Sequence, residues 1–279
     1  MKKFPLAIIA IATISSLLFT ACRKDEYETP QMTLVTNYSS VQFSLGGSGE
    51  ATIDWGDGTP SETYTFAKEN LSPQWFTHSY SSPPPHVIII TGDNITSLDC
   101  AYSGGTRMYV RSLDVSKNPA LTELYCHNNL LTNLDLSRNP ALTELYCYNN
   151  RLTNLNLSRN PALTYLDCSN NQLTNLDLSR NTALTYLDCS DNQLTHLDVS
   201  KNTVLTSLYC LNNQLTHLDV SNTALTSLFC FNNQLQADAL NTLFHSLPVS
   251  YGAIYIYSNP GTEACDKSIA TAKGWSVIY

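Results

Sequence analysis

Two histidine–aspartate pairs are the residues in this sequence that come closest to a metal site. His196 and Asp198 form one pair, and His217 and Asp219 form a second pair 21 residues later. Imidazole and carboxylate groups are metal ligands, and stacked structural repeats would place the two pairs side by side. The sequence offers no third strong metal-binding side chain that the repeat would place beside them. We therefore interpret both histidines as surface residues and expect no metal.

Covalent or acid–base catalysis has no recognisable motif here. The sequence lacks the nucleophile elbow G-x-S-x-G, the zinc-protease motif H-E-x-x-H and a phosphate-binding loop. Residues 54–59 read DWGDGT, but their acids do not fall at the spacing of a calcium-binding EF-hand. An Asp-Gly pair between extended runs is typical of a tight hairpin. We expect a non-enzymatic protein that uses no cofactor.

The side chains best suited to recognition are aromatic and acidic residues in columns of a recurring 21-residue unit, numbered from its first leucine. The predicted ligand-binding residues are Glu123, Glu144, Tyr165 and Tyr186 at the third position, Tyr125, Tyr146, Asp167, Asp188, Tyr209 and Phe229 at the fifth, and Tyr148 and Phe231 at the seventh. Rings beside carboxylates suit stacking on a sugar with hydrogen bonds to its hydroxyls, or an anchor in a protein interface. The alternative is that the tyrosines only stabilise β-structure through cross-strand pairs.

The element that must position these columns is the 21-residue repeat itself. Full copies begin at Leu121, Leu142, Leu163 and Leu184, a shorter copy at Leu205, a half copy at Leu225 and an irregular first copy at Ile95. In each full copy the first half fits L-x-x-L-x-C-x-x-N-x-L, and the second half fits the same pattern with [L/V] in place of Cys and one more residue between the Asn and the next copy. The L-x-L alternation places apolar side chains on one face of a short strand, and the Asn amide satisfies backbone groups at the turn. Stacked copies would bury a continuous leucine core.

The second half of the repeat hardly varies on its outward positions. Asp135, Asn156, Asp177, Asp198 and Asp219 form one such column, and a serine follows two residues later in each copy. This uniformity indicates solvation and hydrogen bonding within turns rather than ligand recognition. The variable first half is therefore the better candidate for a binding surface.

This pattern resembles the leucine-rich repeat, and the resemblance implies a solenoid with a parallel β-sheet on its concave face. One repeat position holds Cys100, Cys126, Cys147, Cys168, Cys189, Cys210 and Cys230. Units of this length with such a column are similar to the internalin J-type cysteine-ladder repeats of bacterial adhesins. The resemblance implies attachment to a ligand. Inward side chains of adjacent parallel strands run alongside one another, whereas disulfides need Cβ atoms directed at each other, so we expect free, buried thiols.

The segments that flank the repeats, which we assign to residues 95–235, have different patterns. Residues 31–94 read as short strands, and WGDGT at 55–59 followed by HSY at 78–80 resembles a PKD domain, which implies an immunoglobulin-like β-sandwich. Residues 237–247 and 265–273 have helical patterns, and 253–257 and 275–279 read as strands. We expect residues 236–279 to form an α/β cap over the open end of the solenoid, with Cys265 buried in it.

The first residues resemble the signal of a bacterial lipoprotein. Lys2 and Lys3 precede an apolar run at 6–19, which is too short for a membrane span, and Thr20-Ala21-Cys22 follows like a lipobox. The resemblance implies a signal peptide at 1–21, lipidation of Cys22 and a tether at 22–30. An ordinary secretory peptide is the alternative. Residues 23–26 read RKDE and look like the surface-export signal of Bacteroidetes lipoproteins, which implies the outer face of the outer membrane.

Composition limits the class of partner. Hydrophobic residues make up 43% of the chain, which predicts a folded protein, and the net charge is −8. The sequence shows no cluster of Lys and Arg, so we expect no basic patch and no nucleic-acid partner. We expect a protein of the mainly β or α+β class that is exposed on the cell surface. We expect it to bind a glycan or protein ligand through the concave repeat face. The alternative is a structural or assembly partner, or an accessory subunit, of an outer-membrane complex.

Overall fold

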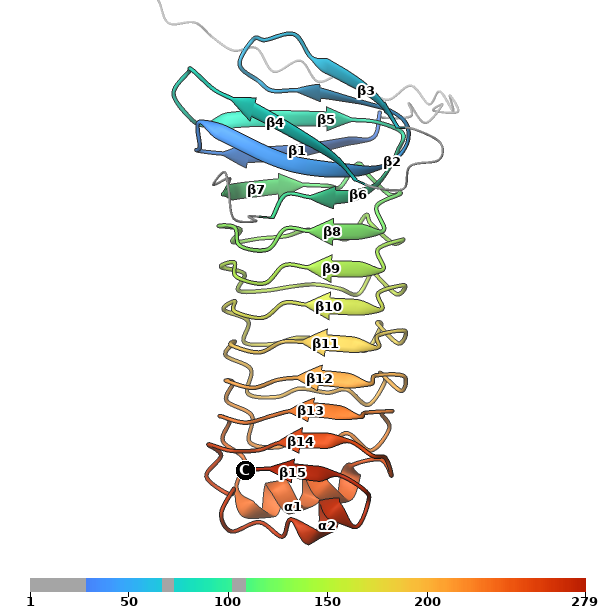
Figure 1. Cartoon of the computed structure of the whole chain (residues 1–279), viewed down its shortest axis with the longest axis vertical. Helices are drawn as coiled ribbons and strands as arrows, with labels where there is room; N and C mark the ends of the chain where they lie inside the picture. The colour runs from blue at the N-terminus through green and yellow to red at the C-terminus, as the bar shows by residue number, and fades with distance from the viewer. Residues whose placement is uncertain (1–28, 67–72, 102–108) are drawn as a thin grey trace, which may run out of the picture.

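The computed structural model describes residues 29–66, 73–101 and 109–279, and this part of the chain is mainly β. Short strands stack crosswise along one elongated body (Figure 1). The stacked strands are β6 (Asn94–Asp99), β8 (Glu123–Tyr125), β9 (Glu144–Tyr146), β10 (Tyr165–Asp167), β11 (Tyr186–Asp188), β12 (Ser207–Tyr209), β13 (Ser227–Phe229), β14 (Ala253–Tyr255) and β15 (Ser276–Ile278). They pair in parallel in chain order. A parallel solenoid with a repeat of about 21 residues is therefore confirmed.

The core of the solenoid is a continuous cluster of leucine and cysteine side chains. Strands β8 to β13 each have three residues, of which the middle leucine is buried and the two neighbours are half-buried. In the third full copy, Leu163, Leu166 and Leu173 have 0% of their surface exposed. No single coil could enclose these side chains, because each lies against the coils before and after it.

A residue pair that ends in asparagine turns the chain after each of β8 to β13, as the repeat pattern predicts, and the first member is also Asn in every copy except at Asp191. The first member takes a left-handed backbone, with φ of 50° at Asn170, which asparagine tolerates better than most residues. The second member is buried. The Nδ2 of Asn171 donates to the carbonyl oxygens of Cys147 and Cys168, both at 3.1 Å, and its Oδ1 accepts from the backbone N–H of Leu152 at 3.0 Å. Each buried amide thus ties neighbouring coils together.

The cysteine column forms a buried ladder. All seven members, and Cys265, are free thiols in the part of the chain that the structure describes. The seven ladder cysteines have 0% exposure, and burial raises the pKa of the Cys168 thiol well above its usual value. The column acts as a row of small apolar side chains.

The N-terminal segment is antiparallel and consists of β1 (Gln31–Thr36), β2 (Ser40–Asp54), β3 (Glu62–Phe66), β4 (Gln74–Ser79), β5 (His86–Thr91) and, from the irregular first repeat, β7 (Val110–Asp114). The long strand β2 takes part in two sheets. Its first half pairs with β4 and β6, and its second half pairs with β3 and β5. Since β6 also pairs with β8, the sheet continues from this segment into the solenoid. The immunoglobulin-like topology and its boundaries at 31–94 stay predictions.

The DWGDGT motif forms a hairpin turn, as predicted, between the paired strands β2 and β3. Gly56 has φ of 73°, and a Cβ at this position would collide with the Val87 carbonyl. Asp57 pairs with His78 at 2.8 Å, and the His78 ring stacks on Trp55 with 4.6 Å between centroids. The two sequence motifs of this segment therefore meet in one polar and aromatic cluster.

After the last repeat, helices α1 (Ala237–Ser246) and α2 (Ser268–Thr271) alternate with β14 and β15. The predicted helices and strands are present, and the two strands extend the parallel sheet of the solenoid. The capping function of this segment stays a prediction. Cys22, the rest of the predicted signal and the insertion at 102–108 lie outside the described residues. Within the described ranges, no helix combines the length and apolar composition needed to span a bilayer.

Candidate functional site

All twelve predicted ligand-binding side chains lie on one surface, the solvent side of strands β8 to β13 and the residues just after them. We call this surface the strand face. The third- and fifth-position residues flank the buried leucine of each strand and are half-buried, so they point outward as predicted. Tyr148 and Phe231, at the seventh position, are also half-buried. The sheet holds these side chains in register, because successive strands pair residue for residue.

The aromatic rings of the strand face form one stack that changes column along the solenoid. Its members in order are Tyr125, Tyr146, Tyr165, Tyr186, Tyr209, Phe229 and Tyr255. Neighbouring centroids are 4.1 to 5.4 Å apart. The stack passes from the fifth position to the third between Tyr146 and Tyr165, and returns between Tyr186 and Tyr209. Tyr255 was not predicted, because it lies beyond the regular repeats.

A second row of aromatic contacts follows the seventh position. His127 stacks on Tyr148 with 4.3 Å between centroids, and Phe231 stacks on Tyr257 with 4.0 Å. Ser169, Ser190 and Leu211 occupy the positions between these two pairs. The row is therefore aromatic at its ends and small or aliphatic in its middle.

Acidic residues take the column that the rings leave free. Asp167 and Asp188 stand at the fifth position in the two copies whose tyrosine is at the third. Asp167 Oδ1 accepts from the Ser169 hydroxyl at 2.7 Å and from its backbone N–H at 3.1 Å. Burial raises the pKa of Asp188 to about 6, and burial also raises the pKa of Asp167. The centre of the strand face thus carries two partly desolvated carboxyl groups.

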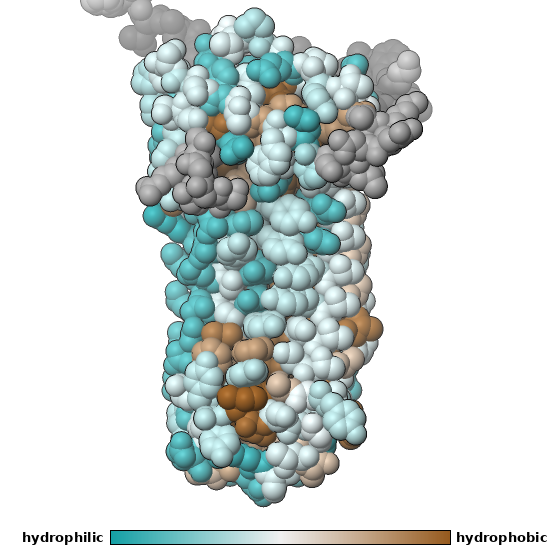
Figure 2. All heavy atoms as spheres, in the orientation of Figure 1, coloured by the Kyte–Doolittle hydropathy of each residue, from teal (hydrophilic) through white to brown (hydrophobic). Residues whose placement is uncertain are grey.

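The ring stack determines which contacts a ligand can make. Tyr146, Tyr165 and Phe229 each have a stacked ring on both sides, so that their edges and the tyrosine hydroxyl groups remain for a ligand. The contact between Tyr186 and Tyr209 is tilted by 36°. While the stack is intact, no sugar ring can lie flat on Tyr146 or Tyr165. Figure 2 shows apolar surface gathered over the last strands of this face and more polar surface over the earlier ones. A ligand that covers the whole strand face would therefore meet polar surface at the earlier strands and apolar surface at the later ones.

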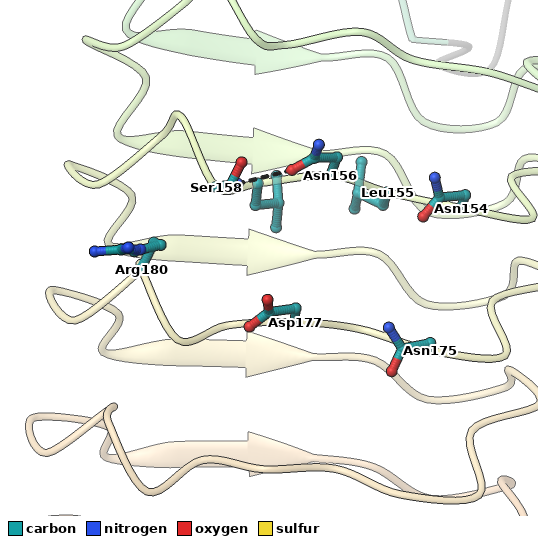
Figure 3. Close-up of a pocket in the computed structure, with 8 residues that line it drawn as sticks. Asn154, Leu155, Asn156, Ser158, Asn175, Asp177 and Arg180 are labelled. Atoms are coloured by element: carbon teal, nitrogen blue, oxygen red, sulfur yellow. Dashed lines mark hydrogen bonds between the residues drawn. The ribbon is translucent and has the colours of Figure 1, made fainter.

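The opposite, return side of each coil carries the uniform columns. Six Asp or Asn side chains accept a hydrogen bond from the backbone N–H two residues later, as Asp177 Oδ1 does from Ser179 at 2.9 Å. This confirms the predicted turn bonding. Shallow hollows lie between the returning segments, and Figure 3 shows one of about 350 Å³ lined by Asn154, Asn175 and Arg180 among others.

The return side also carries a feature that the sequence reasoning missed. Lys117, Arg138, Arg159, Arg180 and Lys201 recur every 21 residues and are all exposed. From the sequence we expect no cluster of Lys and Arg, but these cations form a column in which an Asp accompanies all but Arg159. These residues are far apart in the sequence, and only the stacking of coils brings them into one column. The sequence does contain the signal, because a Lys or Arg recurs at the same position of five successive 21-residue units.

The histidine–aspartate pairs do not form a ligand cluster. Thr195 Oγ1 lies 3.0 Å from His196 Nδ1. Among residues 29–66, 73–101 and 109–279, no group of three or more His, Cys, Asp and Glu side chains is arranged to hold a metal ion.

Residues 161–202 match the family model described as leucine-rich repeats in two copies. The functional domain of InlJ from Listeria monocytogenes, which includes a cysteine ladder, is 33% identical over 63% of this chain and 47% of its own, with a TM-score of 0.36. This chain therefore spans about half the length of that structure. Internalin C2 of Listeria monocytogenes is 23% identical over 66% of this chain and 80% of its own, with a TM-score of 0.54, and this likeness shows the shared fold. No curated protein matches the sequence.

Proposed function

We propose that this leucine-rich-repeat protein is a non-catalytic binding module whose strand face recognises the surface of a protein, which includes the protein part of a glycoprotein. The observation that carries the proposal is the continuous stack of seven rings along that face. Tyrosine is enriched among the residues that dominate protein interfaces. Rings that are already held in place by stacking lose little conformational entropy when a partner binds.

The composition of the strand face favours a protein over a free sugar. Tyr146, Tyr165 and Phe229 have no free face for a sugar, whereas the ring edges suit the mixed apolar and polar contacts of a protein interface. Leu211 and Phe231 add half-buried apolar area near the end of the stack. Asp167 and Asp188 supply acceptors at its centre, where a partner's N–H or O–H groups would meet them.

The proposed location is the outer face of the outer membrane, where the protein would act as a lipid-anchored adhesin. Cys22 is the proposed site of lipidation, and Lys24, Asp25 and Glu26 the proposed export signal. The antiparallel segment that precedes the repeats would then stand between the membrane tether and the strand face.

Site-directed photo-crosslinking on the full chain tests the binding face. A photoreactive phenylalanine at Tyr209 should capture a protein partner, whereas the same group at Asp198 on the return side should not. With the captured partner in hand, Tyr146→Ala and Tyr209→Ala should each weaken binding by about 1–3 kcal/mol. Asp177→Ala and Asp198→Ala are the matched controls, and thermal melts must show that all four variants fold. Sensitivity of the Asp variants with indifference of the Tyr variants would mean that the binding face is reversed.

A further inference from the structure

The basic column on the return side is the strongest charged feature outside the strand face. It consists of Lys117, Arg138, Arg159, Arg180 and Lys201, one in each successive coil. Adjacent coils are about 4.8 Å apart at the strands, so the column presents positive charges at short, regular intervals. The chain as a whole has a net charge of −8. Acidic residues more than about 8 Å away do not cancel the positive potential of the column, because exposed charges at that separation are largely screened at physiological ionic strength.

Carboxylates balance most of this column, but not all of it. Three residues before each cation lies an Asp or Asn. Hydrogen bonds from the Ser two residues later are the main reason that the pKa of Asp135, Asp177 and Asp198 is lowered, and the cation of the same coil adds a smaller effect. The coil of Arg159 is the exception, because it has Asn156 at this position. Asn156 Oδ1 still accepts from the Ser158 N–H at 3.0 Å, so the turn is kept and only the charge is absent.

A hollow of about 720 Å³ lies beside Arg159, the cation whose coil has no Asp three residues earlier. Its lining is Ser158, Arg159, Pro161, Ser179, Arg180 and Thr182, which supplies two guanidinium groups and three hydroxyls but no carboxylate. The hollow of Figure 3 shares Ser158 and Arg180 with it and adds the amides of Asn154 and Asn175, together with the carboxylate of Asp177. Within the described part of the chain, neither Arg159 nor Arg180 makes a hydrogen bond or an ion pair.

We propose that these two adjacent hollows bind an acidic polysaccharide, with its carboxylate or sulfate groups on Arg159 and Arg180 and its hydroxyls on Asn154 and Asn175. Guanidinium groups bind planar or multi-oxygen anions through paired hydrogen bonds. Amides and hydroxyls that both donate and accept suit sugar hydroxyls. The lining has no aromatic ring on which a nucleobase could stack, which favours a sugar chain over a single-stranded nucleic acid. This site is separate from the strand face.

Binding of the full chain to immobilised polysaccharides tests the proposal. Heparin, which carries sulfate and carboxylate, hyaluronan, which carries carboxylate alone, and neutral dextran are the probes. At least one acidic chain should bind, dextran should not, and added salt should weaken binding. Arg159→Gln with Arg180→Gln should weaken it at least tenfold. The matched control is Arg111→Gln with Arg151→Gln, which removes the same charge from two exposed arginines at another hollow and should change binding less than twofold.

A second pair of variants changes the charge without changing the turn. Asn156→Asp restores the carboxylate that the other coils have and should weaken binding severalfold, whereas Asp177→Asn should strengthen it. Equal losses in both arginine pairs would show a general effect of net charge and overturn the proposal, as would an absence of binding to both acidic chains. Single-stranded DNA that binds more tightly than either polysaccharide, with the same loss in Arg159→Gln/Arg180→Gln, would overturn the polysaccharide assignment.

Discussion

Tyr165 and Tyr186 occupy the same position in consecutive coils, and their rings lie parallel, 4.1 Å apart with 3° between their planes. Tyr165 also stacks on Tyr146, at 4.6 Å, although Tyr146 stands in the neighbouring column. The predicted cross-strand pairing of tyrosines is therefore real. The same rings can serve both the sheet and a partner, so mutants of the strand face must be tested for stability as well as for binding.

Removal of one inner ring should destabilise the solenoid measurably. Tyr165→Ala loses ring contacts on two sides, and each aromatic pair contributes about 0.5–1.5 kcal/mol beyond its buried area. We expect a loss of roughly 1–3 kcal/mol in the free energy of unfolding, measured with urea. Tyr165→Phe keeps both stacks and should lose less than half as much. Equal losses in the two variants would show that the hydroxyl, rather than the ring, carries the effect.

Asn171 should be among the most sensitive polar residues of the repeats. Asn171→Ala leaves the buried Leu152 N–H without its acceptor and removes a shared donor from three carbonyl oxygens. We expect a loss on the order of 3 kcal/mol in urea unfolding. The exposed Asn175 of the same coil is the control, and Asn175→Ala should stay within about 0.5 kcal/mol of the parent. Similar losses at both sites would contradict the structural role assigned to the buried amide.

The ladder thiols should resist alkylation until the protein unfolds. Their burial removes access and disfavours the reactive thiolate. Differential alkylation followed by mass spectrometry of each peptide, without reductant, reports every cysteine separately. Cys126 to Cys230 should be labelled only after denaturation. Disulfide-linked peptides between ladder positions would refute the free-thiol ladder.

Asp188 should make the protein less stable as the pH rises from about 4 to 6. Its pKa is raised by burial from an ordinary 3.8 to about 6, so in this window the folded state holds a proton that the unfolded state has released. The contribution of the neutral carboxyl is full below the unfolded pKa and is lost as the pH passes the folded one. Asp188→Asn should remove this dependence and stabilise the protein at neutral pH, as measured by urea unfolding across the window. Asp177→Asn, at an exposed carboxyl with a lowered pKa, should leave the slope between about pH 5 and 6 unchanged, because the contribution of Asp177 changes only nearer its unfolded pKa of 3.8.

Replacement of the proposed lipidated residue should release the protein from membranes. Cys22→Ser removes the thiol that would be acylated, so the protein should move to the soluble fraction and lose incorporation of labelled palmitate. Replacement of Lys24, Asp25 and Glu26 by Ala should keep the label but hide the protein from external protease. A Cys22→Ser variant that still sediments with membranes would refute the lipobox interpretation.

The sequence is sufficient to predict the coil, its inward leucines and cysteines and its outward columns, because each follows from spacing within one repeat. The order in which the rings stack could not be predicted from the sequence. Whether Tyr146 contacts Tyr165 depends on how side chains lean between adjacent columns, which no linear pattern encodes. Strand β7 was also missed, since Val110–Asp114 reads as part of the first repeat but pairs antiparallel with β1. There, packing against the preceding segment outweighs the repeat pattern.

The crosswise arrangement of the stacked strands has a mechanical consequence. Under a pull along the long axis of Figure 1, the rows of hydrogen bonds between coils lie in series. The rows therefore separate one after another and are not sheared together. At the end near β6, the long strand β2 holds the first coil from a second sheet, so this end is clamped. At the other end, β15 pairs only with β14 within the described residues, so coils should peel from there first under tension.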